Sequence, residues 1–120
     1  MRISPDGERI VFDYQEQTGT GFARKIGIAK STGGALEHVL DFPGEAIALK
    51  WSPDGKGVQY LLTRNGATNV WELRFAGGDP KPVTNFTSGT IFDFAWTHDG
   101  KTLLLAKGDS TQDVVLISHL

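Results

Sequence analysis

The apolar residues of this chain fall in short runs, rich in β-branched and aromatic types, separated by clusters of Gly, Pro, Asn, Asp and Ser. This alternation is typical of β-strands joined by turns. No window of helical length shows an apolar stripe at the spacing of an α-helix. The pattern predicts an all-β chain with strands at residues 10–14, 25–30, 36–40, 46–51, 57–63, 69–75, 82–86, 91–96, 102–107 and 113–118.

One turn motif recurs three times and sets the order of these strands. Residues 4–7 and 52–55 read Ser-Pro-Asp-Gly, and residues 97–100 read Thr-His-Asp-Gly. Trp51 and Trp96 each stand directly before a copy, and a Gly-Gly pair follows the third strand of the first two repeats. A period of this size is typical of stacked supersecondary units, among which four-stranded propeller blades are leading candidates.

The composition of the motif explains why it should reverse the chain. Proline presets φ for the first corner of a β-turn, aspartate bonds to nearby backbone, and glycine accepts the positive φ that a side chain resists. His98 replaces proline in the third copy, which removes this preorganisation, but Asp99 and Gly100 remain.

Several segments of the second repeat resemble the WD-like repeats of TolB-type β-propellers. They are Trp-Ser-Pro-Asp-Gly-Lys at 51–56, Val-Trp-Glu-Leu at 70–73, Gly-Gly at 77–78 and Pro-Val-Thr at 82–84. The resemblance implies blades of four antiparallel strands, about two and a half of them, at residues 1–41, 45–87 and 90–120. The last segment is similar to the C-terminal end of propellers in bacterial multidomain kinase or winged-helix proteins.

Two and a half blades fall short of a ring, because propellers typically use four to eight. The first predicted blade lacks its inner strand and the last lacks its outer strand, which leaves exposed strand edges. The sequence therefore predicts either the C-terminal part of a longer propeller or a protomer that completes a ring by self-association through its open blade edges.

Charge and composition narrow the classes of partner. The 120 residues carry a formal net charge of -2 without a basic stripe, which argues against nucleic acid and anionic membranes. The apolar runs are too short to span a bilayer, and no apolar leader follows Met1. No cysteine occurs, and the compartment stays open.

We find no catalytic or ligand-binding constellation in the sequence. A Gly-x-Ser-x-Gly elbow is absent, and no glycine pair opens a Lys-Ser/Thr helix start. His38, His98 and His119 are too widely spaced to suggest zinc. These observations predict no cofactor, no metal and no enzyme activity, and the tryptophans are interpreted as packing residues.

The loops at one rim of the blades are the better functional candidate, because recognition residues concentrate on loops held by a rigid scaffold. We predict an interaction scaffold that binds a protein partner. The candidate partner-binding residues are Phe22, Glu45, Arg64, Asn65 and Asp109.

A second hypothesis is a ligand-gating or sensing propeller within a larger enzyme, either a peptidase or a serine/threonine kinase. In that case the first strands of the blades would line a channel, with Lys50 and Asp93 as its polar candidates.

Overall fold

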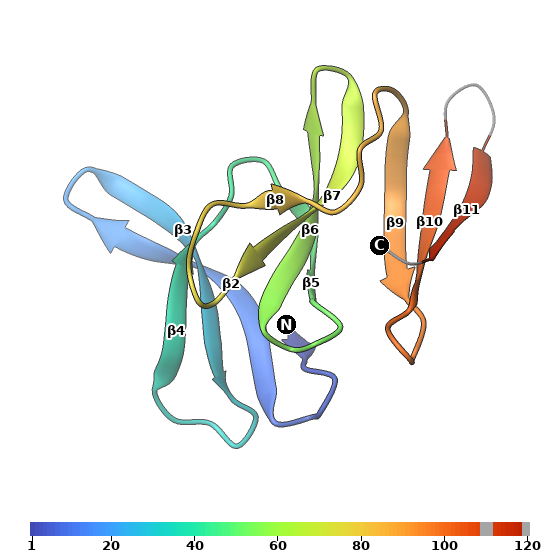
Figure 1. Cartoon of the computed structure of the whole chain (residues 1–120). Coiled ribbons are helices and arrows are strands. Elements are labelled where there is room, and N and C mark those ends of the chain that lie inside the picture. Colours follow the sequence, from blue (N-terminus) through green and yellow to red (C-terminus); the bar gives the residue numbers. More distant parts are fainter. Residues whose placement is uncertain (109–111, 119–120) are drawn as a thin grey trace. The chain divides into compact units, whose positions relative to one another are not determined.

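The computed structural model describes residues 1–108 and 112–118. Every regular element among them is a β-strand, and the strands form three antiparallel sheets (Figure 1). The all-β prediction and the four-stranded antiparallel blade are confirmed. Within the same residues there is no helix of the length and apolar character needed to cross a membrane.

The chain divides into two compact units, residues 1–44 and 45–120. The first unit is one four-stranded sheet in the order β1-β2-β3-β4. Its strands are β1 (Arg2–Ile3), β2 (Arg9–Thr18), β3 (Gly21–Lys30) and β4 (Leu36–Asp41). The first sheet thus begins with a short strand at Arg2–Ile3 that the sequence pattern did not predict.

A close approach between side chain and backbone fixes the middle of this first sheet. Phe12 on β2 stands opposite Gly27 on β3. A Cβ atom at Gly27 would lie 2.7 Å from the Phe12 ring. Because atoms cannot pack that closely, any larger residue at this position would require the Phe12 side chain to move.

The second unit contains the other two sheets. The second sheet has the order β5-β6-β7-β8, and the third has the order β11-β10-β9. Their strands are β5 (Ile47–Trp51), β6 (Gly57–Arg64), β7 (Ala67–Arg74), β8 (Lys81–Pro82), β9 (Thr90–Trp96), β10 (Thr102–Gly108) and β11 (Gln112–Ser118).

The strand expected at 82–86 is shorter in the structure, because a side chain takes over the pairing. Asn69 accepts hydrogen bonds through Oδ1 from the Phe86 amide at 2.7 Å and from Thr84 Oγ1 at 2.8 Å. Its Nδ2 donates to the Phe86 carbonyl at 3.1 Å. We call these three hydrogen bonds the Asn69 clamp. They hold the segment that connects the second sheet to the third against β7.

The three repeated turns are closed by the same hydrogen bonds. The hydroxyl of the first residue donates to the aspartate Oδ1 at 2.6, 2.7 and 2.6 Å in the turns at 4–7, 52–55 and 97–100. That oxygen also accepts from the amide two residues further on, at 2.9, 2.9 and 3.0 Å. The glycines have φ of 77°, 71° and 72°. His98 therefore changes none of these bonds.

The second and third sheets pack face to face through buried apolar side chains. Leu61 and Val70 come from the second sheet, and the third contributes Ile91, Phe94, Leu103 and Leu105. All six are essentially inaccessible to solvent. Full burial of each such side chain contributes roughly 1.5–3 kcal/mol, so this cluster is the main force that joins the two sheets.

Tyr60 on β6 is an exception among the buried residues. It is fully buried, and its hydroxyl has no hydrogen-bond partner within the described part of the chain. Burial raises the pKa of this phenol, while the nearby Arg64 charge acts in the opposite direction. A buried hydroxyl without a partner carries an uncompensated desolvation cost.

We therefore expect Tyr60→Phe to raise the free energy of unfolding by about 1 kcal/mol. Urea denaturation at pH 7 measures this change. Tyr14→Phe, at a half-buried position, is the matched control and should stay within about 0.5 kcal/mol of the parent. A clear loss of stability in Tyr60→Phe would show that the hydroxyl is satisfied in solution.

Candidate functional site

The candidate site lies along β5 and β9, the strands at which the second and third sheets end. We call the outward edges of these two strands the first-strand edges. Lys50 on β5 joins them, since its Nζ donates to Asp93 Oδ1 at 2.9 Å and to the Phe94 carbonyl oxygen. The same Nζ lies 4.9 Å from the centre of the Phe94 ring. The two edges are therefore neighbours.

Each of these strands carries a β-bulge. On β5, Ile47 faces Leu61 and Lys50 faces Gln59, so β5 has one residue more than β6 over this stretch. Ala48, inside the bulge, has a φ of 59°. An L-residue at positive φ is strained, and single strained positions cluster at functional sites.

The bulge on β9 lies at Phe92, just before the positions that correspond to the β5 bulge when the repeated turns are aligned. Ile91 faces Lys107 and Asp93 faces Ala106, which leaves Phe92 without an opposite residue on β10. Phe92 and Ile47 hold corresponding positions ahead of the repeated turn. Bulges redirect side chains and are over-represented at sheet edges and near active sites.

Two large apolar side chains at or beside the bulges are exposed to solvent. Ile47 is 61% exposed and Phe92 is 56% exposed. They stand on adjacent edge strands beside the Lys50–Asp93 ion pair. An edge strand offers backbone donors and acceptors to an extended peptide, and exposed apolar side chains add contact area. The arrangement can therefore bind an extended segment.

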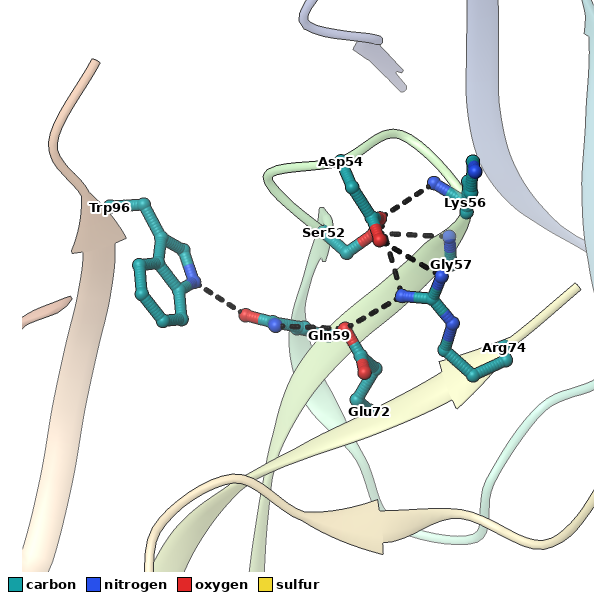
Figure 2. A network of polar contacts seen from close by, with 8 residues as sticks. All are labelled: Ser52, Asp54, Lys56, Gly57, Gln59, Glu72, Arg74 and Trp96. Carbon is teal, nitrogen blue, oxygen red and sulfur yellow. Dashed lines mark hydrogen bonds and ion pairs between the residues drawn. The ribbon is translucent and has the colours of Figure 1, made fainter. Parts of the chain in front are cut away.

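A chain of polar contacts links the second sheet to the third (Figure 2). Trp96 Nε1 donates to Gln59 Oε1 at 2.7 Å, and Gln59 Nε2 donates to Glu72 Oε1 at 3.1 Å. Arg74 Nη1 lies 3.4 Å from Glu72 Oε1 and donates to Asp54 Oδ1 at 3.2 Å. Arg74 Nη2 donates to Asp54 Oδ2 at 2.9 Å. The repeated turn of the second sheet is thus connected to β9 of the third.

Asp54 is the most perturbed group in this network. Its burial acts to raise the pKa, but hydrogen bonds from Arg74, the Lys56 amide and the Ser52 hydroxyl outweigh burial and lower the pKa of Asp54 to about 2. Asp99 in the third turn also has a lowered pKa, chiefly because of its hydrogen bond from Thr97. No arginine contributes to the lowered pKa of Asp99.

A depressed carboxylate pKa stabilises the fold above the unfolded-state value near 3.8. The contribution is lost as the pH falls from about 4 towards 2. Because the Asp54 side chain is about half exposed, we expect it to be worth only about 1 kcal/mol. At pH 7, Asp54→Ala should lower the free energy of unfolding more than Asp99→Ala does. In Asp54→Ala this free energy should also fall less steeply as the solution is acidified. Urea denaturation at pH 7, 4 and 2.5 measures both. Equal losses in the two variants would contradict the role of Arg74.

None of the residues predicted from the sequence belongs to β5 or β9. Phe22 is on β3 in the first unit and is 69% exposed. Glu45 is exposed just before β5, and Asp109 lies outside the described residues. The Arg64 guanidinium lies 4.9 Å from the Trp71 ring centre.

Asn65 has a structural role in the tight turn between β6 and β7. Arg64 pairs with Ala67, so Asn65 and Gly66 alone form the loop. Their φ values are 52° and 77°. Two central residues at positive φ define the hairpin turn for which Asn-Gly is the preferred sequence. The predicted residues Arg64 and Asn65 are thus neighbours at the tip of this hairpin.

The sequence analysis proposed Lys50 and Asp93 as channel residues but missed Ile47 and Phe92. A usable signal was present, because both are large apolar residues at the same place in successive repeats. In the described part of the chain, no cluster of three or more His, Cys, Asp or Glu side chains could hold a metal.

The strain at Ala48 can be tested directly. Ala48→Gly should relieve about 1–2 kcal/mol of strain and lose part of that gain to the greater freedom of unfolded glycine. The expected net effect is a rise of about 0.5 kcal/mol in unfolding free energy. Ala95→Gly, in the ordinary part of β9, should instead lower it by about 0.5–1 kcal/mol. Thermal and urea unfolding of both variants gives the comparison, and a destabilised Ala48→Gly would refute the strain.

No family model matches the chain. Among curated proteins, dipeptidyl-peptidase 5 of Porphyromonas gingivalis is 28% identical over 111 residues, which cover 91% of this chain and 16% of that protein. The Tol-Pal system protein TolB of Nitratidesulfovibrio vulgaris is 27% identical over 107 residues, which cover 81% of this chain and 22% of that protein. The chain thus spans about a fifth or less of the relatives that it matches.

Solved structures agree on the fold. TolB from Acinetobacter baumannii superposes with a TM-score of 0.65 at 23% identity, over 97% of this chain and 28% of that one. The β-propeller domain of the Trilobed protease from Pyrococcus furiosus superposes with a TM-score of 0.57 at 16% identity, over 92% of this chain and 34% of that one.

The strands therefore form part of a β-propeller. More particularly, its blades have the fold of those in TolB, and the predicted resemblance to TolB-type propeller repeats is confirmed.

The relatives overturn one prediction. The chain was predicted not to be an enzyme, yet its relatives include proteins named as peptidases. The prediction is wrong because it searched for catalytic residues only within these 120 residues, whereas the peptidase relatives are several times longer. The chain is a β-propeller segment whose relatives include proteins named as peptidases.

Proposed function

We propose that this chain is the propeller part of a peptidase-type enzyme, and that its first-strand edges bind an extended peptide segment. The observation that carries the proposal is the pair of exposed apolar residues Ile47 and Phe92, which stand at the same distance before the repeated turn on two edge strands that each carry a bulge. The peptidase names among the relatives support the enzyme class.

The chemistry of the edges suits a peptide backbone with apolar side chains. An extended peptide gains hydrogen bonds along a strand edge and places alternate side chains on one face. Ile47 and Phe92 supply apolar contacts, and the Lys50–Asp93 pair supplies one charge of each sign. In propellers the blades surround a central channel, so first strands are well placed to handle a peptide there.

A second candidate is protein binding by loop residues, each within its own unit. It rests on the exposed Phe22 ring in the first unit, and separately on Arg64 in the second unit, which is held over Trp71 at the tip of β6. Aromatic and arginine side chains are the usual anchors of protein interfaces. The similarity to a Tol-Pal system protein supports a protein partner of this kind.

The two candidates predict different sensitive residues. A fluorescent peptide of alternating Leu and Thr is the probe, and a Gly-Ser peptide of equal length is the negative control. Phe92→Ser and Ile47→Ser should each weaken binding of the Leu-Thr peptide about tenfold, equivalent to about 1.4 kcal/mol. Fluorescence anisotropy titration measures the dissociation constants.

Phe22→Ser is the matched control, because Phe22 is as exposed as the two site residues but lies in the first unit. It should bind the peptide as the parent does. If Phe22→Ser alone weakens binding, the peptide binds to the first unit and not to the first-strand edges. Undiminished binding in both Phe92→Ser and Ile47→Ser would overturn the proposal for the first-strand edges.

A further inference from the structure

We propose that Lys50 and Asp93 cap the first-strand edge of β9 at Phe94, and that this cap limits a bound peptide to the part of the edge before it, residues 90–92. The inference rests on the proposed function, because it concerns how long a segment the first-strand edges can bind. It assigns to them a preference for short extended segments, which the proposed function leaves open.

The backbone groups of Phe94 point to the first-strand edge of β9. Alternate residues of an antiparallel strand direct their amide and carbonyl groups to the same side. Thr97 donates its amide to the Thr102 carbonyl across the turn at 2.9 Å, so Thr97 faces β10, and Ala95 faces β10 with it. Phe94 and Trp96 therefore direct their backbone groups to the opposite edge, where an added peptide strand would pair.

Both backbone groups of Phe94 are already bonded. Its amide donates to Asp93 Oδ1 at 2.8 Å, and its carbonyl oxygen accepts from Lys50 Nζ. Lys50 Nζ also donates to Asp93 Oδ1 at 2.9 Å, so one carboxylate oxygen and one ammonium serve the amide, the carbonyl and each other. We call this arrangement the Phe94 cap. A peptide strand at Phe94 would have to compete with these bonds before it could form its own.

The bonds of the Phe94 cap are stronger than those that a neutral peptide offers in exchange. Hydrogen bonds with a charged partner are roughly twice as strong as those between neutral groups. The Lys50 side chain is only 19% exposed, and its Nζ lies 4.9 Å from the centre of the Phe94 ring, within the range of a cation–π contact. Displacement would take acceptors away from a largely buried ammonium, which is costly. A neutral peptide should therefore stop at the cap.

The exposed apolar residues come before the Phe94 cap along both strands. Phe92 stands two residues before Phe94 on β9, and Ile47 stands three residues before Lys50 on β5. The first-strand edges thus offer apolar contacts ahead of the cap and a charged end at the cap. This arrangement fits a short apolar segment better than one that follows β9 over all seven of its residues.

Peptide length provides the test, with two fluorescent peptides of alternating Leu and Thr. The short one matches residues 90–92, and the long one matches all seven residues of β9. The parent should bind both with dissociation constants within about twofold of each other, because the added residues gain no bonds at the cap. In the double variant with Lys50→Met and Asp93→Ala, the long peptide should bind about tenfold more tightly than the short one. Fluorescence anisotropy titration measures all four dissociation constants.

Two further variants separate the cap from a general effect of charge. Lys101→Met combined with Asp79→Ala makes the same change of charge at exposed positions outside β5 and β9, and it should bind the two peptides as the parent does. Asp93→Asn keeps an oxygen that can accept from the Phe94 amide and from Lys50 Nζ, so this variant should also bind both peptides equally.

The outcomes distinguish a failure of the cap from a failure of the proposed function. If the parent binds the long peptide about tenfold more tightly than the short one, the cap is overturned and the peptide site stands. The same holds if a double variant with parent-like circular dichroism gains nothing from length. If the parent binds neither peptide, both proposals are overturned. The comparison within the parent needs no variant, so it decides the question even where the double variant does not fold.

Discussion

The aspartate of the repeated turn is the interaction on which the rest of the structure depends. Its carboxylate accepts from a hydroxyl two residues earlier and from an amide two residues later, which fixes the reversal between the first and second strands. That reversal sets the register of each hairpin, and register decides which side chains reach the core. In the second sheet the same carboxylate also holds Arg74, and through Glu72 and Gln59 it is linked to Trp96 of the third sheet.

The parts of the fold that depend on local chemistry could be predicted from the sequence. Two features are specified by a few adjacent residues, namely the Asp-Gly turns and the Asn-Gly hairpin at Asn65. The bulges could not be found in this way, because a bulge is a mismatch between two strands. Neither Ile47 nor Phe92 has a local signature that distinguishes it from an ordinary strand residue.

The shortened β8 has the same kind of cause. Residues 82–86 have a good strand composition, but Asn69, more than a dozen residues earlier, captures the backbone and hydroxyl groups that a fourth strand would use. The functional error was different in nature. The search for catalytic residues covered only these 120 residues, and its result does not bear on longer proteins such as the peptidase relatives.

The Asn69 clamp has a consequence for how the second unit unfolds. The connecting segment is tied to β7 by three bonds on one amide group, and it continues into β9, whose Ile91 and Phe94 belong to the shared apolar cluster. Separating the third sheet would require loss of the clamp and of the cluster together. The two sheets therefore behave as a single cooperative folding unit, in which neither blade melts without the other.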